Sequence, residues 1–200
     1  MDHFHIQQQR VTSVQTQSGH QIQADQIIIA TGAWSAHWSQ QLNMSIPVKP
    51  VQGQMLLFKT PEQWLSTICM NKVMYLIPRQ DGHIVCGSSM DELGFEHRPN
   101  IQTQQTIYKA CLEMVPELEQ FPIVKQWAGL RPSSPTGVPY IGKMPEFDNL
   151  WANFGHFRNG LCMGPASARL LRQLMLEQPT CVDPAAFSTQ RLESEALTTR

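Results

Sequence analysis

The sequence predicts a mixed α/β fold of the α+β class, and its hydrophobic patterning carries that prediction. Alternating segments across Pro47–Trp127 predict a mostly antiparallel sheet with flanking helices, because alternation marks strands with one buried face. The apolar run Ile27–Ile29 instead predicts a strand that is buried on both faces. Segments on either side of the antiparallel sheet therefore form parts of a second domain, Arg10–Leu42 and Leu150–Gln178.

Individual elements follow from turn signals and helical stripes. The hairpin predicted at Arg10–Ile22 turns at Ser18-Gly19, and the stripe at Pro165–Leu176 predicts a helix with proline in its first turn. The polar end Arg191–Arg200 is expected to fray. The other predicted elements are a short helix at Ser35–Leu42, a strand at Pro47–Lys59, a helical turn at Pro61–Ser66, a hairpin of Val73–Pro78 and His83–Gly87 across Asp81-Gly82, a helix at Thr103–Met114, and strands at Ile123–Trp127 and Leu150–Asn153.

Composition excludes several classes of function. A net charge of −1 without a basic run argues against nucleic-acid binding, and the sequence shows neither an apolar run long enough to span a bilayer nor a signal peptide. The 5 cysteines form no C-x-x-C pair, so they predict neither a zinc site nor a disulfide framework, and reduced thiols favour a cytoplasmic protein. His3 and His5 are a weak metal signal near the N-terminus. The low charged fraction of 16% is compatible with a homo-oligomer.

Two arginines stand in segments rich in glycine and proline. The segments read Gly129-Leu130-Arg131-Pro132 and Gly155-His156-Phe157-Arg158-Asn159-Gly160. Glycine lets a backbone approach a ligand closely, and the planar guanidinium matches a carboxylate or phosphate. The alternative is a pair of ordinary loops with solvent-facing arginines. Gly32, after the apolar run, lies where open α/β sheets place ligands, although a single glycine also fits a plain turn.

Together with Pro139-Tyr140-Ile141-Gly142, these segments resemble the C-terminal half of the FAD-dependent D-amino-acid oxidase superfamily, over about Gln26 to Leu174. The resemblance is greatest to the branch that oxidises glycine in the thiazole pathway of thiamine synthesis. It implies FAD as the cofactor and a small amino acid or amine as the substrate. It further implies pieces of a Rossmann-like FAD-binding domain at residues 1–45 and 129–180, a substrate-binding domain at residues 46–128, and a polar tail at residues 181–200.

The same resemblance implies the site residues. Arg131 is expected to bind the substrate carboxylate, with a structural ion pair as the alternative, whereas Arg158 could reach either the carboxylate or the flavin. Tyr75 and Met90 are expected to shape the substrate pocket, or else to pack in the core, and Val73 stands where the branch has a histidine. No catalytic acid–base residue or metal site is implied. The expected flavin contacts are Gly32, Gly155, His156, Phe157, Arg158, Asn159, Gly160, Leu161 and Cys162.

The phosphate-binding loop typical of such flavoproteins is absent from the sequence. No G-x-G-x-x-G occurs, so we expect the chain to be a fragment that lacks the N-terminal part of the FAD-binding domain. The function stays open between an oxidase that passes electrons to oxygen and forms peroxide, a dehydrogenase of the same fold with another acceptor, and an inactive or partner-binding fragment. Oxygen consumption separates the first two.

Overall fold

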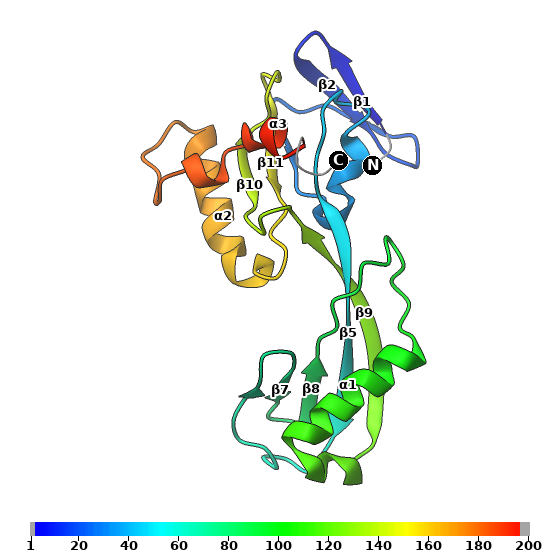
Figure 1. Ribbon diagram of the computed structural model, residues 1–200. Helices are drawn as coiled ribbons and strands as arrows, with labels where there is room; N and C mark the ends of the chain where they lie inside the picture. Colours follow the sequence, from blue (N-terminus) through cyan, green and yellow to red (C-terminus); the bar gives the residue numbers. More distant parts are fainter. Residues whose placement is uncertain (1–2, 197–200) are drawn as a thin grey trace. The chain divides into compact units, whose positions relative to one another are not determined.

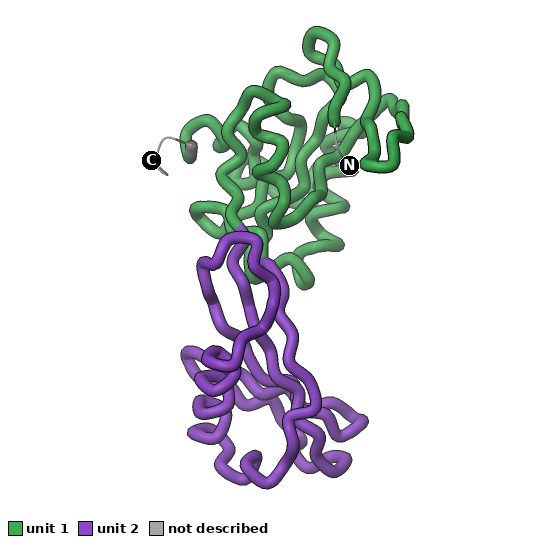
Figure 2. The backbone as a smooth tube through the Cα atoms, turned by 90° about the vertical axis from the view of Figure 1, so that its right-hand side faces the viewer, with its two compact units in different colours: residues 1–49, 131–200 green, residues 50–130 purple. Residues whose placement is uncertain are grey.

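The computed structural model describes residues 3–196, and the chain divides into two compact units (Figures 1 and 2). Unit 1 comprises residues 1–49 and 131–200, and unit 2 comprises residues 50–130. The chain enters unit 2 along β5 (Lys49–Lys59) and returns along β9 (Ile123–Ser133). Assigning unit 1 to cofactor binding and unit 2 to substrate binding stays a prediction.

Unit 2 contains a five-stranded sheet in the order β6-β7-β8-β5-β9. Strands β6 (Cys69–Met70), β7 (Tyr75–Pro78), β8 (His83–Gly87) and β5 pair antiparallel, which confirms the predicted antiparallel sheet. Helix α1 (Ile101–Met114) packs on this sheet (Figure 1), and the short helix η2 (Pro116–Gln120) follows it. The buried core consists of Leu56, Phe58, Met74, Leu76, Ile84, Cys86, Ile107, Cys111 and Leu118.

Local signals explain the boundaries in unit 2. Helix α1 begins after Asn100, whose side chain accepts a hydrogen bond from the Thr103 N–H. The β7–β8 hairpin turns at Asp81-Gly82 as predicted, and Gly82 has φ 76°, a conformation that favours glycine. Two predictions need correction. Strand β7 begins at Tyr75 rather than at Val73, and Pro61–Ser66 forms turns rather than a helical turn.

Unit 1 contains two three-stranded sheets. In the first, β1 (His3–Gln7), β2 (Arg10–Gln15) and β3 (Gln21–Ile22) pair antiparallel, so the predicted hairpin gains a further strand at β1. In the second, the order is β10-β11-β4; β10 (Tyr140–Lys143) runs antiparallel to β11 (Leu150–Phe154), which runs parallel to β4 (Ile27–Ile29). The core includes Phe4, Val11, Val14, Ile27, Ile29, Trp38, Tyr140, Leu150, Ala152, Phe154 and Leu192. Helix α2 (Gly160–Met175) covers the opposite face of the second sheet through Leu170 and Leu171, which pack with Ile141.

Two predictions near β4 are corrected. The strand is not buried on both faces, because Ile28 is 43% exposed between the buried Ile27 and Ile29. Among the described strands β4 has a partner on one side only, so that no strand pairs with its other edge. The predicted helix at Ser35–Leu42 is instead the 3₁₀ helix η1 (Gly32–Trp38), which begins earlier and buries Ala33 and Trp38.

Three more corrections concern the segments that carry the motifs. Strand β9 extends to Ser133, so Arg131 lies in a strand rather than in a turn. Helix α2 begins at Gly160, which puts Pro165 inside the helix rather than in its first turn. The predicted frayed tail contains helix α3 (Arg191–Ala196), preceded by η3 (Ala185–Phe187), because Leu192 is buried in the core of unit 1. Residues 197–200 lie outside the described residues.

Candidate functional site

Two glycines of unit 1 follow the carboxyl ends of two neighbouring strands of the second sheet. Strands β4 and β11 are parallel neighbours, with Ile29 opposite Ala152, and the chain leaves them towards Gly32 and Gly155 respectively. Both glycines have left-handed backbones, with φ 57° and φ 81°. Since ligands of open α/β sheets bind beyond the carboxyl ends of the strands, the region beside these two glycines is the first candidate for a ligand site.

The backbone connects Arg131 to the Gly155–Asn159 loop. The Phe157 N–H donates to the Pro132 carbonyl at 2.8 Å, and Ser133 pairs with His156 as an isolated antiparallel bridge. The half-buried Arg131 immediately precedes these contacts, whereas Arg158 is exposed. The structure therefore brings Arg131 and the loop together within unit 1.

The loop itself holds an unusual backbone conformation. Phe157 has φ 47°, in the left-handed region that residues other than glycine seldom adopt. Such conformations cluster at ligand-binding positions, where the surrounding contacts enforce them. No sequence pattern identified this feature, because phenylalanine gives no local preference for it.

His156 fastens the loop to helix α2. Its Nε2 lies 3.0 Å from the Ser167 hydroxyl, and burial lowers the pKa of the imidazole. The neutral ring therefore predominates near neutral pH, hydrogen-bonded to a buried serine. This arrangement suits a histidine that holds the loop in place.

The N-terminus of α2 provides donors for an electron-rich ligand. The first N–H groups of a helix have no partner within the helix, and here the Asn159 side chain makes no capping hydrogen bond. No acidic residue occupies the first turn, so nothing there offsets the positive end of the helix dipole. Leu161 is 95% exposed and Cys162 is also exposed. Gly160, Leu161 and Cys162, expected in a loop, therefore belong to the helix start.

Contacts within the protein itself explain why glycine occupies two of these positions. A Cβ on Gly155 would lie 3.2 Å from the Tyr140 ring and 3.4 Å from the Ser134 Cβ. A Cβ on Gly160 would lie 3.3 Å from the Cβ of His156. Side chains of the chain itself already occupy these spaces. A substitution at either glycine would therefore disturb the loop even if no ligand were present.

The two predicted pocket residues of unit 2 differ in burial. Tyr75 is half-buried on β7, and its hydroxyl donates to the Met55 sulfur at 3.5 Å. Gly87 lies between them in the sheet, opposite both Tyr75 and Met55, and a Cβ there would meet the Met55 sulfur at 2.3 Å. Met55 is thus a further candidate pocket residue that sequence reasoning missed. Met90 follows β8 and is 54% exposed.

Buried glutamines hold the segment that carries Met90. Gln52 and Gln54 are both 0% exposed, and Gln54 Nε2 donates to Gln52 Oε1 at 2.7 Å. Gln52 Nε2 donates to the Glu96 carbonyl at 2.7 Å, and its backbone pairs with Asp91. Sequence reasoning missed both residues, since polar residues in an alternating strand are expected on its solvent face.

Comparison with known proteins decides the family. The sequence model of the DAO family, whose description is FAD-dependent oxidoreductase, matches residues 2–174. The chain belongs to this DAO family. Its members use FAD, which confirms the cofactor implied by the motifs. Glycine oxidase of Pseudomonas aeruginosa is 44% identical over 179 residues, which cover 90% of this chain and 49% of that protein.

Other relatives of the DAO family agree with this assignment. The bifunctional protein ThiO/ThiG of Trichormus variabilis is 32% identical, over 96% of this chain and 29% of that protein. The crystal structure of glycine oxidase from Geobacillus kaustophilus has a TM-score of 0.84 at 29% identity, over 90% of this chain and 48% of that one. The chain spans about half the length of the glycine oxidases that it matches.

The residues of unit 1 fit the FAD of this family. The uncapped start of α2 and the exposed Arg158 can receive the negative charge that a reduced flavin carries. Among residues 3–196 no group of His, Cys, Asp and Glu is arranged to hold a metal ion. No helix in this described part is long and apolar enough to cross a membrane.

Proposed function

We propose that this chain forms the substrate-binding and flavin-facing part of an oxidase that acts on glycine or another small amine. In this reaction the amine becomes an imine and oxygen becomes hydrogen peroxide. The names of the relatives support the proposal, since two Pseudomonas proteins at 44% and 42% identity are glycine oxidases. The similarity to ThiO/ThiG proteins supports a role in thiamine thiazole synthesis. The free cysteines of the described chain favour the cytoplasm.

In this proposal the chain orients the substrate rather than activating it. Bound FAD would supply the hydride acceptor, so that the protein needs few titrating groups. Arg131 binds the substrate carboxylate through two parallel hydrogen bonds, which fixes the direction of the C–H bond. Arg158 contributes positive charge to either the carboxylate or the flavin. Tyr75 and Met90 line the substrate pocket, and Val73 in place of histidine alters the choice of amine.

The observation that carries the proposal is the connection between β9 and the flavin loop. The 2.8 Å hydrogen bond from Phe157 to Pro132 and the bridge between Ser133 and His156 fix the Arg131 backbone relative to the loop. Positional precision of this kind is what hydride transfer requires of a carboxylate-binding residue.

The test replaces Arg131 by leucine in the flavin-containing protein. Removing one member of a carboxylate pair costs about 2–5 kcal/mol, so kcat/KM for glycine should fall roughly 30-fold to several thousand-fold. The visible flavin spectrum should stay unchanged. Arg172→Leu is the matched control, because this exposed arginine lies at the opposite end of α2 and hydrogen-bonds Gln178. Equal kcat/KM in the two variants would contradict the assignment of Arg131.

Two further measurements separate the alternative functions. Oxygen uptake with glycine distinguishes an oxidase from a dehydrogenase of the same fold, which would reduce another acceptor. Titration of the 200-residue chain with FAD, followed by flavin fluorescence, tests the third alternative of an inactive fragment. One-to-one micromolar binding would show that these residues suffice to hold the cofactor.

A further inference from the structure

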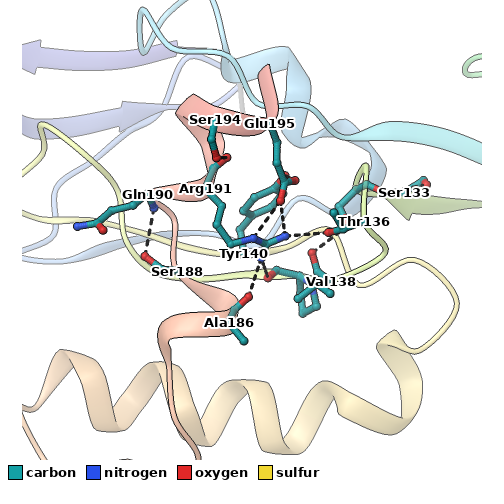
Figure 3. Close-up of polar contacts among 12 residues, drawn as sticks. Ser133, Thr136, Val138, Tyr140, Ala186, Ser188, Gln190, Arg191, Ser194 and Glu195 are labelled. Carbon is teal, nitrogen blue, oxygen red and sulfur yellow. Dashed lines mark hydrogen bonds and ion pairs between the residues drawn. The ribbon is translucent and has the colours of Figure 1, made fainter. Parts of the chain in front are cut away.

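Helix α3 is attached to the turn between β9 and β10 through Arg191 (Figure 3). Its guanidinium donates to the Thr136 hydroxyl at 2.8 Å and to the carbonyls of Ala186 and Pro139 at 2.9 and 3.3 Å. It also pairs with Glu195 one helical turn further on, at 2.7 Å. The guanidinium thus joins the helix to the middle of the turn at Thr136 and to its end at Pro139.

Tyr140 completes this cluster. The guanidinium carbon of Arg191 lies 5.0 Å from the centre of the Tyr140 ring, and the Tyr140 hydroxyl donates to Glu195 at 2.5 Å. Tyr140 is 0% exposed, while the side chains of Arg191 and Glu195 are 20% and 14% exposed. Burial and the adjacent Glu195 carboxylate raise the pKa of Tyr140, so the ring stays neutral and keeps its donor proton. The cation–π contact with Arg191 and the hydrogen bond to Glu195 therefore both hold the Tyr140 ring.

The Tyr140 ring packs against the Gly155–Asn159 loop, the proposed flavin contact. The Tyr140 ring lies against Gly155, where an added Cβ would come within 3.2 Å of it, and Ser134 lies beside the same glycine. From the same turn, Gly137 faces Phe157, with an added Cβ at 3.9 Å from that ring. Tyr140 and the turn thus lie beside the two ends of Gly155–Phe157, the segment that precedes the start of α2.

We propose that Tyr140 is a positioning residue for the flavin, held in place by Arg191 and Glu195 of helix α3. The cluster keeps the Gly155–Asn159 loop and the start of α2 in the geometry that receives the cofactor. This inference rests on the proposed function, because it takes that loop as the flavin contact. It assigns a role in cofactor binding to a helix that the sequence predicts to be a frayed tail.

The test uses variants that keep the packing of the ring. Tyr140→Phe removes only the hydroxyl, and Arg191→Met removes the guanidinium while retaining much of the apolar stem. Ser194→Ala is the matched control on α3, since the Ser194 hydroxyl bonds only the carbonyl of Arg191 among the contacts drawn in Figure 3. Hydrogen–deuterium exchange is measured on the 200-residue chain, and FAD release is measured by flavin fluorescence on the flavin-containing protein.

We expect exchange of the Gly155–Asn159 amides to accelerate about tenfold in Tyr140→Phe and Arg191→Met, the scale of losing one hydrogen bond to a charged group. Amides of β1 and β2 should keep their rates, which distinguishes loosening of the loop from general destabilisation. FAD should also dissociate about tenfold more readily, whereas Ser194→Ala should match the original chain.

Either of two results would overturn the inference. In the first, Tyr140→Phe and Arg191→Met both fold, and hydrogen exchange of their Gly155–Asn159 amides is no faster than in Ser194→Ala. In the second, this exchange accelerates while the rate of FAD release stays unchanged. Failure of the proposed function would look different. The flavin would then respond to the variants as expected, but neither glycine nor a related amine would reduce it.

Discussion

The buried glutamines of unit 2 give a prediction that needs no cofactor. Gln54 donates to Gln52 and accepts hydrogen bonds from the Asn100 N–H at 3.1 Å and from Gln126 Nε2 at 3.0 Å. Leucine has a similar volume and no polar atom. Gln54→Leu therefore removes these bonds while leaving the space filled, and the result reports hydrogen bonding rather than a cavity.

The magnitude follows from the exposure of the partners. Gln52 is 0% exposed, so its Oε1 would lose the Gln54 donor where water cannot replace it, at a cost of about 1–3 kcal/mol. Asn100 is exposed and Gln126 is half-buried, so water can replace their lost partner at little cost. We expect a net loss of about 2 kcal/mol in the free energy of unfolding, or about 4–8 °C in Tm for a chain of this size.

Thermal unfolding followed by circular dichroism measures this difference. Gln105→Leu is the matched control, because Gln105 is exposed on α1 and its replacement should change stability by less than about 0.5 kcal/mol. Hydrogen exchange should also show faster opening of residues 91–98, which Gln52 holds through the Glu96 carbonyl and the Asp91 backbone. Equal Tm values for the two variants would refute the reasoning.

Two further predictions concern helix α2 and its loop. Because burial lowers the pKa of His156, the unfolded chain takes up a proton first as the pH falls below about 6.5. The free energy of unfolding should therefore decrease on the acid side down to the folded pKa, and less so in His156→Gln; identical pH profiles of Tm would contradict this. Gly164→Ala should raise Tm, since no atom beyond its chain neighbours and the backbone of α2 lies within 4 Å of the added Cβ, and alanine favours helix by about 1 kcal/mol. Gly160→Ala should not raise it, because its Cβ would crowd His156; a matching gain in both variants would argue against that contact.

The sequence predicted those elements whose boundaries are set locally. The Asp81-Gly82 turn determines the β7–β8 hairpin through contacts among near neighbours. In the same way, the helical spacing of the buried Ile107 and Cys111 predicts α1. The motifs also sufficed to recognise the family, because three short segments in a fixed order are far more specific than any one of them.

Elements whose form depends on distant partners were misjudged. Arg131 looked like a turn residue next to glycine and proline, yet β9 continues past it, where Phe157 and His156 supply backbone partners. The polar segment of α3 looked unstructured, but Leu192 enters the core and Arg191 binds a turn 55 residues away. Neither outcome can be derived from local preference, since both depend on which segments meet in unit 1.

These distant contacts converge on the proposed flavin loop. Strand β9 holds Phe157 through Pro132, helix α2 holds His156 through Ser167, and Tyr140 packs against Gly155. Each support comes from a different element, and each is a contact among residues of the chain itself. Supports of this kind reduce the ordering that the loop has to undergo when a ligand binds, so that less binding energy is lost to ordering it. By the same reasoning, substitutions at Tyr140 or Ser167 would weaken cofactor binding without either side chain having to touch the flavin.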